Sequence, residues 1–177
     1  MFVDEFEIWL TRKSVKRINL RVKPPDGRIE ASIPRRCPYP EFEKFVCEHA
    51  GWIRKAQTRI LESPQSVASS ATEEERKEWR QIVEAFTPLL IERWEAVIGV
   101  KCQKLVYRDM KSRWGSCQPS TGRICINTRL ALYPPECLEY VVVHELCHLR
   151  ERGHGPAFKS LMDLYLPDWR ERRNLLK

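Results

Sequence analysis

The sequence predicts an α+β fold, a compact domain with a small mixed or antiparallel sheet, a long backing helix and a further helix that carries a histidine cluster. Apolar residues alternate with period two in several short segments and recur every three or four residues in longer ones, and Gly and Pro mark the ends of these segments. The chain has 177 residues, of which 42% are hydrophobic and 31% are charged. This composition excludes collagen-like, disordered and membrane-spanning proteins.

The first elements are predicted to be strands. In residues 17–23, Ile18, Leu20 and Val22 alternate with polar or basic residues, which gives the strand one buried face. A Pro-Pro-Asp-Gly turn at residues 24–27 leads into a return strand that Pro34 ends. Residues 3–10 are expected to form a preceding strand.

Helices are predicted from residue 40 onward. A helical period over residues 40–62 is followed by a Ser- and Ala-rich stretch that predicts a flexible connector at 66–72. Thr72 and Glu75 form a capping box that starts a long helix, which Pro88 should kink or split and Gly99 should end. We therefore expect a single domain, 1–177, with N-terminal strands and helix at 1–65, the connector at 66–72 and the core at 73–177.

The core adds two strands and three helices. Residues 103–109 and 123–127 are predicted strands, and residues 111–117 lie between them without a clear period. A helix should run from Pro135 to about Arg152, where Gly153 stops it. A helix at about 156–166 follows, and a short one begins near Pro167.

Three of the four histidines fall within eleven residues, at positions 144, 148 and 154. His144 and His148 are separated by about 40° on a helix, so both imidazoles reach one point, as bidentate metal binding requires. Glu145 lies about 100° round from His144, where it can take the proton of a metal-bound water. The pattern predicts a Zn²⁺ site, with Glu145 as the catalytic base.

A third protein ligand is needed, and His154 is the predicted one. Gly153 breaks the helix just before it, so the chain can turn and bring the imidazole to the metal. Cys147 is interpreted as core packing, because a second soft ligand beside His148 would crowd the ion. Three later carboxylates are the alternative third ligands: Asp163, Asp168 and Glu171.

Further motifs surround this cluster in order. They are Lys-Ser-Arg-Trp-Gly-Ser-Cys at 111–117, Gly-Arg-Ile-Cys-Ile-Asn at 122–127, Tyr-Val-Val-Val-His-Glu-Leu-Cys-His-Leu at 140–149 and His-Gly-Pro-Ala-Phe at 154–158. With the Pro-Asp-Gly hairpin near the N-terminus, they closely resemble the YgjP-like metallopeptidase family over nearly the whole chain. This family is similar at longer range to the SprT-like and WLM zinc proteases. The resemblance implies a zincin fold, one zinc ion on His144, His148 and His154, and Glu145 as the catalytic residue.

The function implied is a zinc-dependent hydrolase, a metallopeptidase that acts on a peptide or protein. One alternative is a metal-dependent nucleotide (UTP) pyrophosphohydrolase. Its hydrolysis of a nucleoside triphosphate would depend on basic side chains such as Lys111, Arg113 and Arg150. A second alternative is a nucleic-acid-associated SprT-like protease module. The net charge of +7 suits an anionic partner, and it equally suits a solvated basic surface.

Substrate contacts are expected from the strand and loop beside the histidine helix. Residues 124–127 are predicted to form the sheet edge above the metal, where an extended peptide would add as a strand. Arg113 and Asn127 are the candidate substrate-binding residues, because either would stabilise a developing oxyanion. Arg113 has an alternative role as a brace of the fold, and Trp114 is interpreted as a plug in the core.

The seven cysteines predict reduced thiols in the cytoplasm, most of them buried. No Cys-x-x-Cys pair occurs, and the acidic start at Asp4 and Glu5 is unlike a signal peptide. No apolar run approaches the roughly 18 residues of a membrane span, so no membrane partner is expected.

Overall fold

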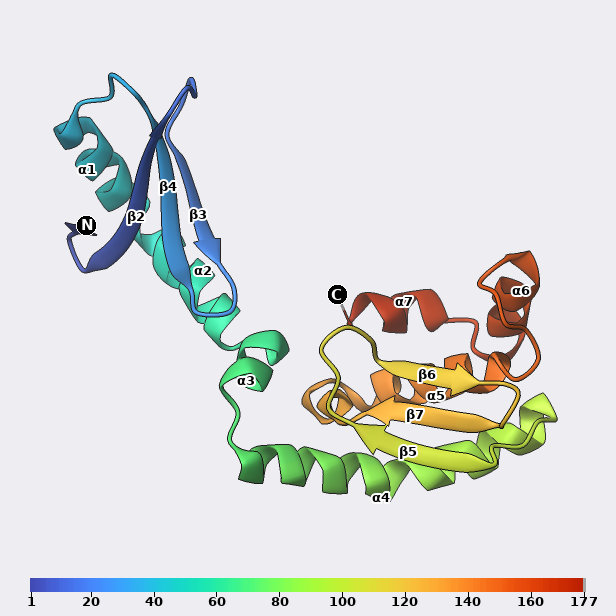
Figure 1. The fold of residues 1–177 in the computed structure, drawn as a ribbon. Helices are drawn as coiled ribbons and strands as arrows, with labels where there is room; N and C mark the ends of the chain where they lie inside the picture. The colour runs from blue at the N-terminus through green and yellow to red at the C-terminus, as the bar shows by residue number, and fades with distance from the viewer. Residues whose placement is uncertain (177) are drawn as a thin grey trace. The chain divides into compact units, whose positions relative to one another are not determined.

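The computed structural model describes residues 1–176, and its contacts divide the chain into two compact units, Met1–Ala71 and Thr72–Lys177. Each unit combines helices with a small sheet, so the predicted α+β class is confirmed (Figure 1). The boundary falls at the end of the predicted connector. None of the helices in residues 1–176 is both long enough and apolar enough to cross a membrane.

The N-terminal unit contains a four-stranded mixed sheet in the order β1-β2-β4-β3, in which β4 is parallel to β2 and antiparallel to β3. The predicted return strand is confirmed as β4, in which Ile29, Ala31 and Ile33 are buried on one face. Gly27 has φ +70°, the conformation that the hairpin between β3 and β4 requires. The strands are β1 (Phe2–Val3), β2 (Phe6–Lys13), β3 (Asn19–Lys23) and β4 (Arg28–Pro34).

Two helical predictions for this unit were wrong. Residues 40–62 do not form one helix, because the chain breaks at His49 into α1 (Tyr39–Glu48) and α2 (Ala50–Leu61). The His49 ring bonds the Phe45 carbonyl at 2.8 Å, which competes with the backbone ladder at that turn. The stretch predicted to be flexible is helical as α3 (Pro64–Ser70), which the Ser63 side chain caps by accepting from Ser66 N–H.

The C-terminal unit begins with the long helix α4 (Glu73–Ile98). Its capping box is present as predicted, and Gly99 ends it with φ +72°. Pro88 does not split the helix, which continues through it. The position is exposed, so the missing N–H removes one bond at the solvent side only, and Thr87 beside it donates to the Val83 carbonyl at 2.6 Å.

The sheet of this unit has the order β5-β7-β6, with β7 central, parallel to β5 and antiparallel to β6. The prediction that residues 124–127 form the sheet edge was therefore wrong. The edge position belongs to β6, a strand that the sequence did not predict. The strands are β5 (Lys104–Arg108), β6 (Gly115–Gln118) and β7 (Arg123–Asn127), and the 3-10 helix η1 (Thr128–Leu132) follows them.

Three helices complete the unit: α5 (Pro135–Cys147), α6 (Pro156–Tyr165) and α7 (Trp169–Asn174). The helix α5 ends five residues before the predicted end at Arg152. Leu149 and Arg150 N–H bond carbonyls three residues back, and Glu151 N–H bonds the Cys147 carbonyl, so the chain tightens into turns. His148 stands at the C-cap with φ −66° and ψ −18°, still close to helical geometry.

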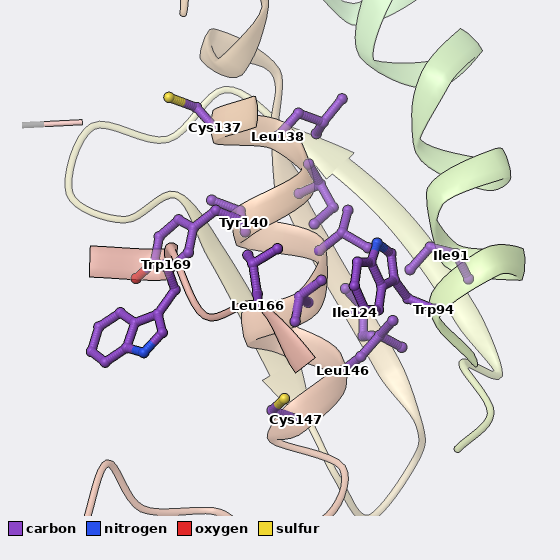
Figure 2. Packing of buried hydrophobic residues seen from close by; sticks show 14 of the residues in the cluster. Ile91, Trp94, Ile124, Cys137, Leu138, Tyr140, Leu146, Cys147, Leu166 and Trp169 are labelled. Carbon is purple, nitrogen blue, oxygen red and sulfur yellow. The ribbon is translucent and has the colours of Figure 1, made fainter. Parts of the chain in front are cut away.

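Packing between α4, α5 and the inner face of the sheet fixes the end of α5 in place. Ile124 and Ile126 of β7 and Leu146 of α5 are fully buried, and Trp94 of α4 packs into the same core (Figure 2). Trp114 lies against this core with its ring edge-on to Tyr133, as its predicted role of core plug requires. Leu146 and Cys147, which directly precede His148, are thus held in a close-packed core.

Candidate metal centre

Three histidine nitrogens converge at the end of α5. The Nε2 atoms of His144, His148 and His154 lie 3.1–3.2 Å from one another. Two of them come from the last turn of α5 and its C-cap, and the third comes from the loop before α6. Among the His, Cys, Asp and Glu side chains of residues 1–176, no other three bring ligand atoms this close together.

The protonation of the cluster suits a metal ligand set. The Nδ1 atom of His148 lies 2.9 Å from the Glu151 carbonyl, which can only accept, so Nδ1 carries the proton and Nε2 keeps its lone pair. Burial, reinforced by the neighbouring imidazoles, lowers the pKa of His144 to about 3. Burial also lowers the pKa of His148. Both rings are therefore neutral at physiological pH, the form that binds metal.

The spacing of the three nitrogens fits a zinc ion. Three Nε2 atoms at this separation can all lie about 2.0–2.1 Å from one centre, the usual Zn–N distance, and such a set leaves a fourth position open. Two of the three alternative carboxylates have other partners, because Asp163 accepts from Trp169 and Arg170, and Asp168 pairs with Arg172. Cys147 is fully buried in the core, and burial raises the pKa of its thiol to about 12.

Phe158 supports all three imidazoles, and sequence reasoning gave it no role. Its ring stacks on His148 with centroids 4.5 Å apart and meets His144 and His154 edge-on at 4.8 and 4.9 Å. The side chain is 2% exposed. The rigid Phe158 ring fixes the orientations of the three imidazoles before any ion binds. Its position one turn after His154 was the only signal in the sequence.

Glu145 is buried next to this cluster and lines the same cleft. Its pKa is raised to about 8 by burial, and the Arg113 charge opposes that shift. The cleft has a volume of about 570 Å³ and is walled by Gly115–Cys117 of β6 as well as by the histidines. Gly115 passes so near that a Cβ there would lie 2.5 Å from Glu145 Oε1. Only a glycine leaves room for this carboxyl group.

The strand that walls the cleft has one unpaired side. The bond from Asn127 N–H to the Trp114 carbonyl, at 2.9 Å, sets the alternation of the β6–β7 ladder. By this alternation Ser116 bonds toward β7, and the backbone groups of Gly115 and Cys117 point to the free edge. No other strand of residues 1–176 lies on that side. Gly115 and Cys117 also line the cleft, so the free edge borders it.

Of the two candidate substrate residues, Arg113 lies in the loop before β6, and Asn127, the last residue of β7, holds that loop. The Asn127 side chain donates to the Met110 and Arg113 carbonyls, both at 2.7 Å, and accepts from the Met110 and Arg129 N–H groups. It is 1% exposed, so any effect of Asn127 on substrate acts through the loop that it holds. Arg113 is exposed and lines a hollow on the outer face of the sheet.

Comparisons with known proteins identify the family of the chain. Residues 16–81 and 68–177 match the family described as YgjP-like, metallopeptidase domain. No curated protein matches the chain. Two crystal structures of metallopeptidase zymogens are similar to part of it. Abylysin of Pyrococcus abyssi has a TM-score of 0.47 at 20% identity over 51% of this chain and 91% of its own. Jannalysin of Methanocaldococcus jannaschii has a TM-score of 0.45 at 18% identity over 51% and 92%. Because the family match extends from residue 16 to residue 177, the chain belongs to the YgjP-like metallopeptidase family and is a metal-dependent peptidase.

Proposed function

We propose that the protein is a zinc metallopeptidase in which His144, His148 and His154 hold one Zn²⁺ per chain and Glu145 is the catalytic base. The observation that carries the proposal is the convergence of three Nε2 atoms within 3.2 Å in a cleft that Glu145 also lines. Three imidazoles with one open position are the donor set of catalytic zinc sites.

The ion and the side chains have different roles in the proposed reaction. Zinc, when bound, supplies a Lewis acid that activates water and polarises a carbonyl group. A divalent ion held by the three histidines would oppose the effect of burial on Glu145 and would favour the ionised carboxylate. Glu145 then accepts the proton of the attacking water and passes it to the leaving amine. The apolar surroundings of Glu145 strengthen this proton transfer, because little water competes for the carboxylate.

The free edge of β6 supports an extended peptide as the substrate. Such a peptide would pair with the outward N–H and C=O groups of Gly115 and Cys117 and add a fourth strand to the sheet. This pairing would place a substrate carbonyl over the cleft that holds Glu145. The seven free thiols support the cytoplasm, where thiols stay reduced, as the compartment.

The nucleotide alternative receives no support from the cleft. Of the cations expected to serve a triphosphate, neither Lys111 nor Arg150 lines it, and Arg150 donates to the Tyr165 hydroxyl instead. Arg113 lies on the other side of β6. Arg152 is the one cation among the residues that line the cleft, too little to neutralise a triphosphate.

The test compares metal content with turnover in two variants. We expect Glu145→Gln to keep its zinc and to lose about 10²–10⁴ in peptide hydrolysis, the usual contribution of a positioned base. We expect His154→Ala to lose most of its zinc by elemental analysis. Glu136→Gln, an exposed glutamate in the first turn of the same helix, is the matched control and should change neither quantity. Near-normal hydrolysis by Glu145→Gln, or full zinc in His154→Ala, would remove the assigned role.

A further inference from the structure

The outer face of the three-stranded sheet carries a concentration of unpaired positive charge. A hollow of about 350 Å³ there is lined by Arg108, Arg113 and Arg123 together with polar and sulfur-bearing side chains. No carboxylate lines it, and within residues 1–176 none of the three guanidinium groups has an ion pair. We call this the arginine hollow.

The register of the sheet explains why these arginines gather. Ile124 and Ile126 of β7 face the core and are fully buried, so the alternate residues Arg123 and Cys125 face outward. Arg108 of β5 pairs with Asn127 and shares that outward face. Arg113 joins them from the loop that crosses the end of β7, held there by the Asn127 side chain.

We propose that the arginine hollow binds the carboxylate of an acidic substrate side chain, so that the protein prefers peptides that contain Glu or Asp. This inference rests on the proposed peptidase function and names its substrate class. Three cations of one sign around a small hollow repel one another, and a bound carboxylate relieves that repulsion while arginine offers it paired donors. Arg76 and Arg129 nearby already share the Asp109 carboxylate, whereas no ion pair within the described part of the chain is formed by the arginines of the hollow.

The position of the hollow ties it to the cleft. Ser116 and Cys117 of β6 line both, so the strand is a shared wall. Ser116 pairs with Cys125 and therefore faces outward, toward the hollow. In a peptide added to the free edge of β6, the residue opposite Ser116 would also turn its side chain outward. An acidic side chain at that residue would reach the hollow while its neighbours faced the cleft.

A peptide fits these observations better than a nucleic acid does. The lining of the hollow contains no aromatic ring on which a base could stack, and stacking is the usual anchor of single strands. Asp109, paired with two arginines beside the loop, also interrupts any longer basic track. The hollow is thus a pocket for one anionic group.

Binding of matched peptides is the direct test. Dye-labelled octapeptides with one Glu, moved through the positions, are compared with Gln twins by fluorescence anisotropy on the full chain carrying Glu145→Gln, which prevents turnover. We expect the best Glu peptide to bind about tenfold more tightly than its twin, as a charge-assisted pair provides. The preference should shrink in about 0.2 M salt.

Arginine variants locate the effect. Arg123→Gln and Arg113→Gln should each weaken the preference for Glu, and the triple variant with Arg108→Gln should abolish it, with circular dichroism and metal content unchanged. Lys77→Gln, an exposed cation of α4, removes the same charge elsewhere and should leave the preference intact. Equal affinity for the twins, or a preference that survives the triple variant, overturns the proposal.

Two further measurements distinguish a failure of this inference from a failure of the proposed peptidase function. An unstructured oligonucleotide that binds more tightly than the peptides through the same arginines would make the hollow a nucleic-acid site instead. Hydrolysis of the same peptides by the metal-loaded wild-type protein is measured in parallel. Failure to cleave any peptide counts against the proposed function, and the binding preference still decides the inference. Equal binding and equal cleavage of the twins count against the inference alone.

Discussion

Gly115 is the residue of β6 that passes close to the carboxyl group of Glu145, the proposed catalytic base. An ideal Cβ there would lie 2.5, 2.8 and 2.9 Å from the Oε1, Cγ and Cδ atoms of Glu145. Because Glu145 of α5 is only 5% exposed, its carboxyl group has little room to retreat. Close approach, rather than a special backbone angle, therefore requires glycine at this position.

The substitution Gly115→Ala is expected to reduce hydrolysis without removing the metal. The added methyl group displaces the carboxyl of Glu145, and misplacement of a reacting group by about 1 Å can cost about 10²-fold in rate. Elemental analysis should still find zinc, because no histidine lies among the nearest contacts of the added Cβ. Gly51→Ala, which meets nothing within 4 Å in α2, is the matched control and should keep full activity. Normal turnover by Gly115→Ala would show that the Glu145 position is not critical.

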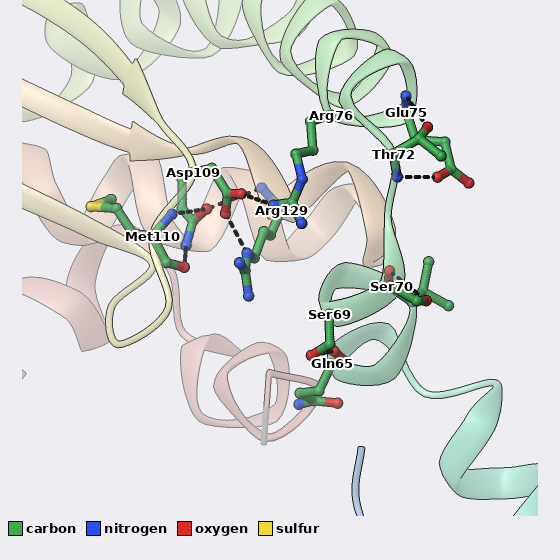
Figure 3. A network of polar contacts seen from close by, with 11 residues as sticks. Gln65, Ser69, Ser70, Thr72, Glu75, Arg76, Asp109, Met110 and Arg129 are labelled. Atoms are coloured by element: carbon green, nitrogen blue, oxygen red, sulfur yellow. Dashed lines mark hydrogen bonds and ion pairs between the residues drawn. The ribbon is translucent and has the colours of Figure 1, made fainter. Parts of the chain in front are cut away.

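At the scale of elements, the loop between β5 and β6 is fastened at both ends. Asp109 forms ion pairs with Arg76 of α4 and Arg129 of η1 (Figure 3). Asn127 holds the middle of the loop through the Met110 and Arg113 carbonyls. This fastening fixes both the start of β6 and the position of Arg113, so it serves the cleft and the arginine hollow alike.

The Asp109 pairs give the protein a predictable dependence on pH. Burial alone would raise the pKa of Asp109, but the hydrogen bonds and charges of Arg129 and Arg76 outweigh it and lower the pKa below its ordinary 3.8. The unfolded state then binds more protons than the folded state between the two values. The stability from these pairs is therefore complete above the unfolded pKa and is lost as the pH falls through the folded one.

We accordingly expect Asp109→Asn to lower the free energy of unfolding by about 1 kcal/mol at pH 7. The loss relative to wild type should shrink as the pH falls below about 4. Urea unfolding at several pH values measures it, with the exposed Asp4→Asn as a control for the loss of one carboxylate. A deficit that stays constant down to pH 3 would mean that the ion pairs are not its source.

The strand β6 offers a second test at this scale, through its backbone. Cys117→Pro removes an N–H that points to the free edge and leaves the bonds of Ser116 to β7 in place. We expect peptide hydrolysis to fall by about tenfold or more with zinc content unchanged, since one main-chain bond to the substrate is lost. Cys117→Ala, which removes the thiol and keeps the N–H, should retain activity. Equal activity of the two variants would argue against strand addition.

Elements with a clear hydrophobic period could be predicted, and elements without one could not. The alternation at Ile124 and Ile126 predicted β7, and the capping box of Thr72 and Glu75 predicted the start of α4. The segment Gly-Ser-Cys-Gln of β6 has no alternation, because its neighbours are a carboxyl group on one side and polar residues on the other. As β6 was missed, β7 was given the edge position that β6 holds.

At the scale of the whole molecule, the candidate metal centre lies in one of the two compact units. All three histidines and Glu145 belong to Thr72–Lys177, and Met1–Ala71 supplies none of them. The family matches, 16–81 and 68–177, nevertheless extend over both. We propose that residues 1–177 act as one functional domain with its chemistry confined to the second unit.

Metal removal should therefore loosen only one part of the chain. We expect chelation to accelerate amide hydrogen exchange around the end of α5, in residues 148–155 and in β6, because an ion bound to the folded state alone stabilises it. Exchange in β2 and β4 should not change. His154→Ala should show no response to added zinc. Equal loss of protection in both units would contradict this division.

The site itself could be predicted only as far as it is local in sequence. Two histidines one helical turn apart and a third after a glycine are visible in a short window, and so is the glutamate beside them. Gly115 beside Glu145, and Arg108 and Arg123 of the arginine hollow, come from three strands that only the folded sheet brings together. Gly115 and Arg123 lie within the motifs at 111–117 and 122–127, but no pattern within one segment indicates what they contact, so this arrangement could not be predicted.

The open edge of β6 has a consequence for which proteins such an enzyme can attack. On the proposed mode of binding, the substrate must offer its own backbone amides to Gly115 and Cys117, and a segment already inside a helix or a central strand has none to offer. A natively folded protein would be a poor substrate however many glutamates it displayed. Nascent chains, damaged chains and loose termini would be cleaved first. The conformational state of the target would therefore determine whether it can bind at all, and its sequence would matter only among unfolded segments.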